Sequence, residues 1–192
     1  MAGFYTSVTP TVDVVGEKLD LLSILADQRA LLALTARGLT DEQARRPTTV
    51  SEFTLGSLIK HVAVVLEDNV RMLRERDETA TVDLAGVGEG LTFGPDESLD
   101  QWLEALTTAG VELERYVADL DGLDGPIPQP TAPWAPERVV WSARRVLLHV
   151  LREVAHHCGH ADMIREALDG QTTMGALTEG MDIDWDASPG GS

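Results

Sequence analysis

Residues 142–170 read SARRVLLHVLREVAHHCGHADMIREALDG. Apolar side chains recur there at three- and four-residue spacing from Ser142 to about Leu168, and Asp169-Gly170 is typical of a helix stop. Three further segments have the same period, at about 19–37, 54–76 and 98–120. Because helix breakers fall between these segments rather than inside them, the sequence predicts four long amphipathic helices. A four-helix bundle buries four apolar stripes, so we predict an all-α fold.

The segments between the predicted helices have their own signals. The stretches 40–43 and 98–101 have the capping-box pattern, and Thr54 is an expected N-cap. Residues 77–97 are rich in Asp, Glu and Gly, which is typical of a mobile loop. Residues 121–136 are rich in proline, which indicates an irregular crossing between helices. We therefore expect one domain over residues 1–170, followed by an acidic, loosely ordered tail at 171–192.

Composition excludes several classes of protein. The 192 residues are 43% hydrophobic and 24% charged, as in ordinary globular proteins and unlike disordered chains. The formal charge of −17 repels phosphate backbones and anionic lipid, so nucleic-acid and membrane partners are not expected. The single cysteine, Cys158, allows no internal disulfide, and no secretory signal or membrane-length apolar run is evident. We expect a cytoplasmic protein.

The histidines are unevenly distributed. Four of the five lie on the last predicted helix, where they share an arc of about 100° with one carboxylate; these residues are His149, Glu153, His156, His157 and His160. The fifth, His61, lies midway along the second predicted helix. Helix bundles build metal sites from inward-facing Glu and His at this spacing, and three protein ligands leave an open position typical of catalytic sites.

The spacing alone leaves two questions open. Both Glu153/His157 and His156/His160 are four residues apart, so either pair can face a ligand on another helix. Clustered histidines also occur as a solvated face or as hydrogen-bonded core residues, and spacing supports these interpretations equally. Cys158 lies on the opposite side of the helix, which favours a buried structural thiol over a nucleophile.

Four stretches resemble one known family: TDEQARR at 40–46, TLGSLIKH at 54–61, HVLREVAHHCGHAD at 149–162 and IREALDG at 164–170. Together they are similar to the DinB-like superfamily (DinB/YfiT-like bundles), and more closely to its actinobacterial branch related to mycothiol-dependent maleylpyruvate isomerase. The resemblance covers about residues 15–170. It implies an up-and-down-type four-helix bundle with a divalent metal held between the second and fourth helices.

The resemblance also implies roles for individual residues. The matching metal ligands are His61, Glu153 and His157, and His160 falls where an acid/base group or a polar neighbour of the site is expected. His156 departs from the family, because many relatives carry Arg there, and the pair His156/His160 remains an alternative. Two histidines and a carboxylate suit zinc first, but also nickel, iron or manganese.

The activities of the superfamily are thiol-dependent, which implies a metal-dependent S-transferase that delivers a low-molecular-weight thiol, mycothiol in actinobacteria, to an electrophile. A non-enzymatic metal-binding stress or regulatory bundle and a metal-assisted hydrolase are the alternatives. The partners would be a small thiol and an electrophile, and a homodimer is compatible with the family.

Overall fold

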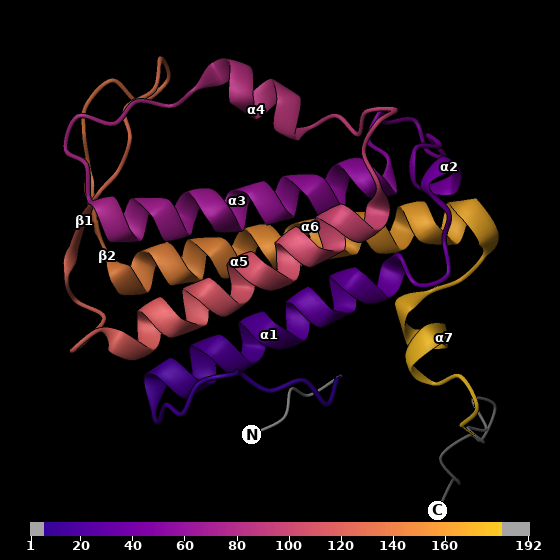
Figure 1. Cartoon of the computed structure of the whole chain (residues 1–192), viewed down its shortest axis with the longest axis horizontal. Helices are drawn as coiled ribbons and strands as arrows, with labels where there is room; N and C mark the ends of the chain where they lie inside the picture. Colours follow the sequence, from indigo (N-terminus) through magenta and orange to yellow (C-terminus); the bar gives the residue numbers. More distant parts are fainter. Residues whose placement is uncertain (1–5, 182–192) are drawn as a thin grey trace, which may run out of the picture.

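Four long helices form the body of the molecule (Figure 1), in a computed structural model that describes residues 6–181. Each long helix begins within two residues of its predicted start, and the all-α four-helix bundle is confirmed. The bounds of the long helices are α1 Glu17–Thr35, α3 Leu55–Glu75, α5 Leu99–Asp119 and α6 Ala143–Asp169. α3 packs on α5 and α6, and α1 packs on the same two helices.

The predicted helix ends are formed by the residues that the sequence indicates. The side chains of Thr40, Thr54 and Ser98 each accept a hydrogen bond from the backbone N–H three residues later. Thr40 begins the short helix α2 (Asp41–Ala44). Gly170 ends α6 in the left-handed region at φ 82°, which glycine adopts without steric cost.

The helices do not alternate in direction. Lys60 and Glu97, near the starts of α3 and α5, form an ion pair of 2.7 Å, and Tyr116 near the end of α5 donates a hydrogen bond to Leu73 O near the end of α3. α3 and α5 therefore run parallel, and the bundle is up-down-down-up. The up-and-down order implied by the resemblance is wrong in this respect, because α3 and α5 are parallel neighbours. Parallel neighbours need a connection that returns along the whole length of the bundle.

That connection is the crossover at residues 76–98, which arches over α3 (Figure 1). It contains the short helix α4 (Leu84–Gly90), capped by Asp83, within a stretch that the sequence predicted as a loop. A two-stranded hairpin, β1 (Pro126–Pro128) paired with β2 (Val140–Ser142), lies beside the N-terminal part of the crossover, with Ile127 fully buried. Strands of three residues are too short to show a pattern of alternating apolar and polar side chains. The sequence therefore indicated only an irregular crossing in this part of the chain.

The C-terminal part of α6 joins two neighbouring segments. Arg165 donates hydrogen bonds to the carbonyl oxygens of Thr35, the last residue of α1, and of Arg37 just beyond it. Asp162 accepts two from Thr173, which begins the short helix α7 (Thr173–Leu177). α7 lies inside the segment expected as a tail; residues 182–192 lie outside the described part of the chain, so the loose order of that segment stays a prediction.

A buried ion pair crosses the interface between α1 and α5. Arg29 binds Glu114, whose side chain is 2% exposed and also accepts hydrogen bonds from the backbone and hydroxyl of Thr11 at 2.7 Å each. The guanidinium lies directly over Gly110 on α5, where a Cβ would be 1.0 Å from Arg29 Nη1. The absence of a side chain at Gly110 is therefore what lets Arg29 reach its partner.

We predict that Gly110→Ala destabilises the protein. The methyl group displaces Arg29 and leaves Glu114 buried without its cation, which costs about 3–5 kcal/mol. The higher helix propensity of alanine offsets up to about 1 kcal/mol, for a net loss of about 2–4 kcal/mol in urea unfolding.

Gly159→Ala is the matched control. Gly159 also lies inside a long helix, but nothing stands within 4 Å of the added Cβ. This variant should be neutral or more stable by up to about 1 kcal/mol. Equal stability changes in the two variants would refute the role assigned to Gly110.

Candidate metal centre

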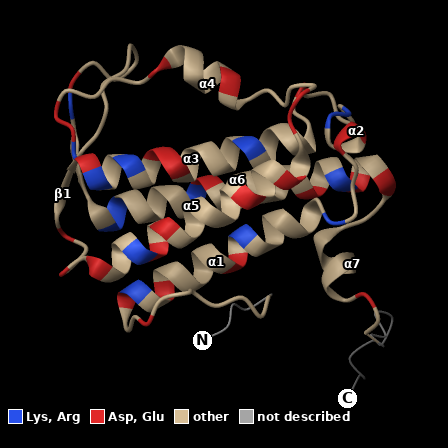
Figure 2. Ribbon diagram, viewed as in Figure 1, with Lys and Arg blue, Asp and Glu red and all other residues tan. Residues whose placement is uncertain are grey.

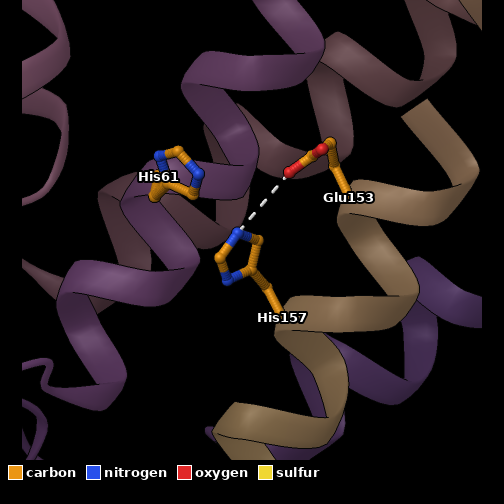
Figure 3. A group of neighbouring side chains, drawn as sticks. All are labelled: His61, Glu153 and His157. Atoms are coloured by element: carbon orange, nitrogen blue, oxygen red, sulfur yellow. Dashed lines mark ion pairs between the residues drawn. The ribbon is translucent and has the colours of Figure 1, made fainter. Parts of the chain in front are cut away.

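Burial of one stripe of α6 sets which residues face α3. Val150, Val154 and Ala161 are fully buried in the core. The helical period then turns Glu153 and His157 toward α3, which presents His61 from the opposite side (Figure 3). Each of these three residues offers one ligand atom, and the three atoms lie within 4.8 Å of one another.

The geometry of the three side chains is close to that of a metal site. His157 Nε2 lies 3.7 Å from Glu153 Oε2, and the rings of His61 and His157 meet edge-to-face with centroids 4.7 Å apart. Two ligand atoms on one tetrahedral zinc ion are about 3.3 Å apart, given bonds of about 2.0–2.1 Å. Rotations that bring the atoms together by up to about 1.5 Å would therefore complete the site.

Glu153 is held from two sides. Arg152 donates a hydrogen bond to its Oε1 at 2.6 Å, and His149 Nδ1 lies 3.6 Å from the same oxygen. Partial burial acts to raise the pKa of Glu153, but the hydrogen bond and charge of Arg152, with the adjacent His149 and His157, outweigh it and lower the pKa. The carboxylate is thus ionised at neutral pH, with Oε2 facing His157.

The two imidazoles are available as neutral ligands. Burial, reinforced by the neighbouring His61, lowers the pKa of His157 to about 4, and burial also lowers the pKa of His61. Nδ1 of His157 is buried and has no hydrogen-bond partner among the described residues. Two neutral imidazoles and one carboxylate suit a divalent cation of the zinc type, so the residues fit the group that the resemblance implies.

The competing histidine pair lies elsewhere. His156 and His160 are exposed, with ring centroids 4.4 Å apart, on the outer side of His157. Neither joins His61 in a ligand cluster among residues 6–181. The geometry therefore favours Glu153/His157 as the partners of His61. His160, expected as an acid/base group, has its ring 5.6 Å from that of His157.

Sequence reasoning assigned no role to His149. Its ring contacts Trp141 edge-to-face at 5.5 Å, and it borders both Glu153 and a cavity of about 500 Å³. The only feature of the sequence that pointed to His149 was its place on the same helical arc as the other histidines. The cavity lies along α3 from His61 toward the C-terminal end of that helix, below the crossover and beside the hairpin.

Cys158 is not placed for chemistry. Its side chain is buried on the core side of α6, away from the three candidate ligands. Burial, with a contribution from Asp162, raises the pKa of the thiol to about 11, so the thiolate is scarce at neutral pH. This agrees with the structural role expected from the helical arc.

Comparison with known proteins identifies the family. The family model described as mycothiol-S-transferase matches residues 20–170. The chain belongs to the mycothiol S-transferase family. This family lies in the actinobacterial DinB-like branch that the four sequence stretches resemble, and the match covers the bundle with all three candidate ligands.

No match was found among the curated proteins or the solved structures with which the chain was compared. Within residues 6–181, none of the helices combines the length and apolar character needed to cross a membrane.

We predict that His61→Ala, Glu153→Ala and His157→Ala each lower zinc affinity by more than about a hundredfold. Groups that only orient a ligand cost about 10–100-fold when removed, so loss of a ligand itself costs more. Elemental analysis and competition with a chromophoric chelator measure the effect.

His156→Ala and His160→Ala are the matched controls, because they remove imidazoles from the same helix. Both should keep about one zinc per chain at near-normal affinity. Loss of zinc in His156→Ala, with retention in Glu153→Ala, would mean that the other pair binds the metal.

The low pKa of His157 predicts a pH dependence in the metal-free protein. The unfolded chain takes up a proton near pH 6.5, the ordinary value, whereas the folded chain does so only near pH 4. Stability is therefore complete above about pH 6.5 and lost as the pH falls toward 4, by about 2 kcal/mol between pH 7 and pH 5. Urea unfolding of the metal-free protein measures this loss, and His157→Gln should reduce it; His61 and His149, whose pKa values burial also lowers, account for a remaining loss. An unchanged slope in that variant would contradict the assignment.

Proposed function

We propose that this protein is a divalent-metal-dependent S-transferase that uses mycothiol or a similar low-molecular-weight thiol. The observation that carries the proposal is the cluster of His61, Glu153 and His157 beside a cavity, in a chain of the mycothiol S-transferase family. Zinc is the first expectation for the cation, with nickel, iron and manganese as alternatives.

A cation bound by these three residues supplies positive charge, which favours the thiolate form of a thiol over its protonated form. The chain's own residues keep the site ready for that charge. Both imidazoles are neutral at physiological pH, and Glu153 is ionised. Because His61 also borders the cavity, a ligand there can reach the centre from one side.

The thiol must lose its proton as its sulfur attacks the electrophile, and two histidines are candidates to take it. His149 borders the cavity and lies 3.6 Å from Glu153, whereas His160 is exposed and does not line the cavity. The location of His149 supports it as the nearer proton acceptor. Cys158 takes no part, because it is buried on the other side of α6.

We predict that the zinc-loaded protein accelerates displacement of chloride from 1-chloro-2,4-dinitrobenzene by mycothiol. His61→Ala should lower kcat/KM by at least about a hundredfold, since a catalytic cation contributes several kcal/mol. Cys158→Ala should remain within about twofold of wild type, because this thiol is not the nucleophile. Absorbance of the thioether product measures the rate.

Two further arms of this assay separate the alternatives. His149→Gln should lower the rate more than His160→Gln, and the reverse order would return the proton-transfer role to His160. Ester hydrolysis that continues without any thiol would support a hydrolase instead. Stoichiometric binding of zinc and thiol with no turnover of any electrophile would support the binding-protein alternative.

A further inference from the structure

Two buried amide side chains in the cavity have unused hydrogen-bond acceptors. Asn69 on α3 and Gln129 beside the hairpin both line the cavity, and they are 9% and 8% exposed. Their N–H groups donate to the carbonyl oxygens of Val65 and Ile127, at 2.7 and 3.1 Å. The amide oxygens of Asn69 and Gln129 accept no hydrogen bond from any residue in the described part of the chain.

The charged groups around the cavity are also acceptors. Asp68, Glu75, Asp77 and Asp83 line it, and Figure 2 shows further acidic positions along the crossover. Arg71 is the one Lys or Arg among the described lining residues, and Asp68 already binds its guanidinium at 2.6 Å. The cavity therefore offers many acceptors and negative charge, with no free cation to balance an anion.

These acceptors lie at a defined distance from the candidate metal centre. His61 and Asn69 are on the same face of α3, eight residues and thus about 12 Å apart along the helix. Val65, between His61 and Asn69, and Met72, after Asn69, provide apolar contact area in the cavity. A ligand that extends along this face can reach His61 at one end and the two amides at the other.

We propose that this cavity binds the uncharged, hydroxyl-rich part of the thiol co-substrate, and that Asn69 and Gln129 determine its selection. The proposal rests on the function proposed above. Hydroxyl groups donate to free amide and carboxylate oxygens, whereas an anionic group beside the two amides is repelled by the carboxylates and finds no unpaired Lys or Arg among the described lining residues. Mycothiol fits this description, because its acetylcysteine is joined to an uncharged glucosaminyl-inositol unit.

The test uses a ligand without a thiol, so that binding does not depend on transferase activity. Calorimetric titration of the whole protein with N-acetylglucosaminyl-inositol should show binding, with or without zinc and also in His61→Ala. The inositol phosphate ester of the same disaccharide is the matched anionic probe, and it should bind at least about tenfold more weakly, because its phosphate carries nearly two negative charges.

Two variants test the residues. Asn69→Leu and Gln129→Met keep the approximate size of each side chain and should each weaken binding by about three- to tenfold, the value of one hydrogen bond. Gln101→Met, at an exposed position on α5 outside the cavity, should leave it unchanged.

Each outcome bears on the proposal. Absent binding of the neutral disaccharide, equal binding of its phosphate ester, or unchanged affinity in both cavity variants would overturn it. Disaccharide binding that Asn69→Leu and Gln129→Met weaken supports it, even if no thiol is ever transferred. If the disaccharide binds in this way but no thiol is transferred, only the proposed catalytic function fails. Failure of the binding proposal and failure of the proposed function are therefore distinguishable.

Discussion

The parallel arrangement of α3 and α5 is the constraint on which the rest of the structure depends. α3 has 21 residues and is about 31 Å long, so the chain must return over that distance before α5 can begin. The crossover does so above α3, bound at one end by Arg138, which donates to Ala80 O, and at the other by Arg45, which donates to Gly94 O. Between these two anchors lies the cavity, so the topology itself creates the space beside His61.

The two halves of the candidate site come from different kinds of structure. The three candidate ligands lie on long helices whose rotation is set by burial of apolar stripes, which suits a centre that must be held precisely. The cavity wall opposite α3 is formed by the crossover and the hairpin, whose regular structure is limited to the short helix α4 and two three-residue strands. Sequence changes in those connections can alter the ligand that is bound while the ligand-bearing helices stay as they are.

Periodicity and capping residues predicted the four long helices well, because those signals are local and repeat over many turns. Choosing Glu153/His157 over His156/His160 required the family resemblance, since both pairs have the same spacing. α4 was missed because Gly86, Gly88 and Gly90 give it low helix propensity. The need for glycine at position 110 could not be foreseen, because it depends on Arg29 from another helix. The free oxygens of Asn69 and Gln129 likewise exist only once distant segments surround them.

The position of the candidate ligands along the chain has a consequence for how the protein comes apart. His61 and the pair on α6 are separated by most of the bundle sequence, so the complete ligand set exists only after the last helix has docked against α3. A cation held by all three residues would act as a reversible cross-link across that interface. Separating the two helices would then require release of the cation, which raises the barrier to unfolding and lengthens the lifetime of the folded chain in the presence of proteases.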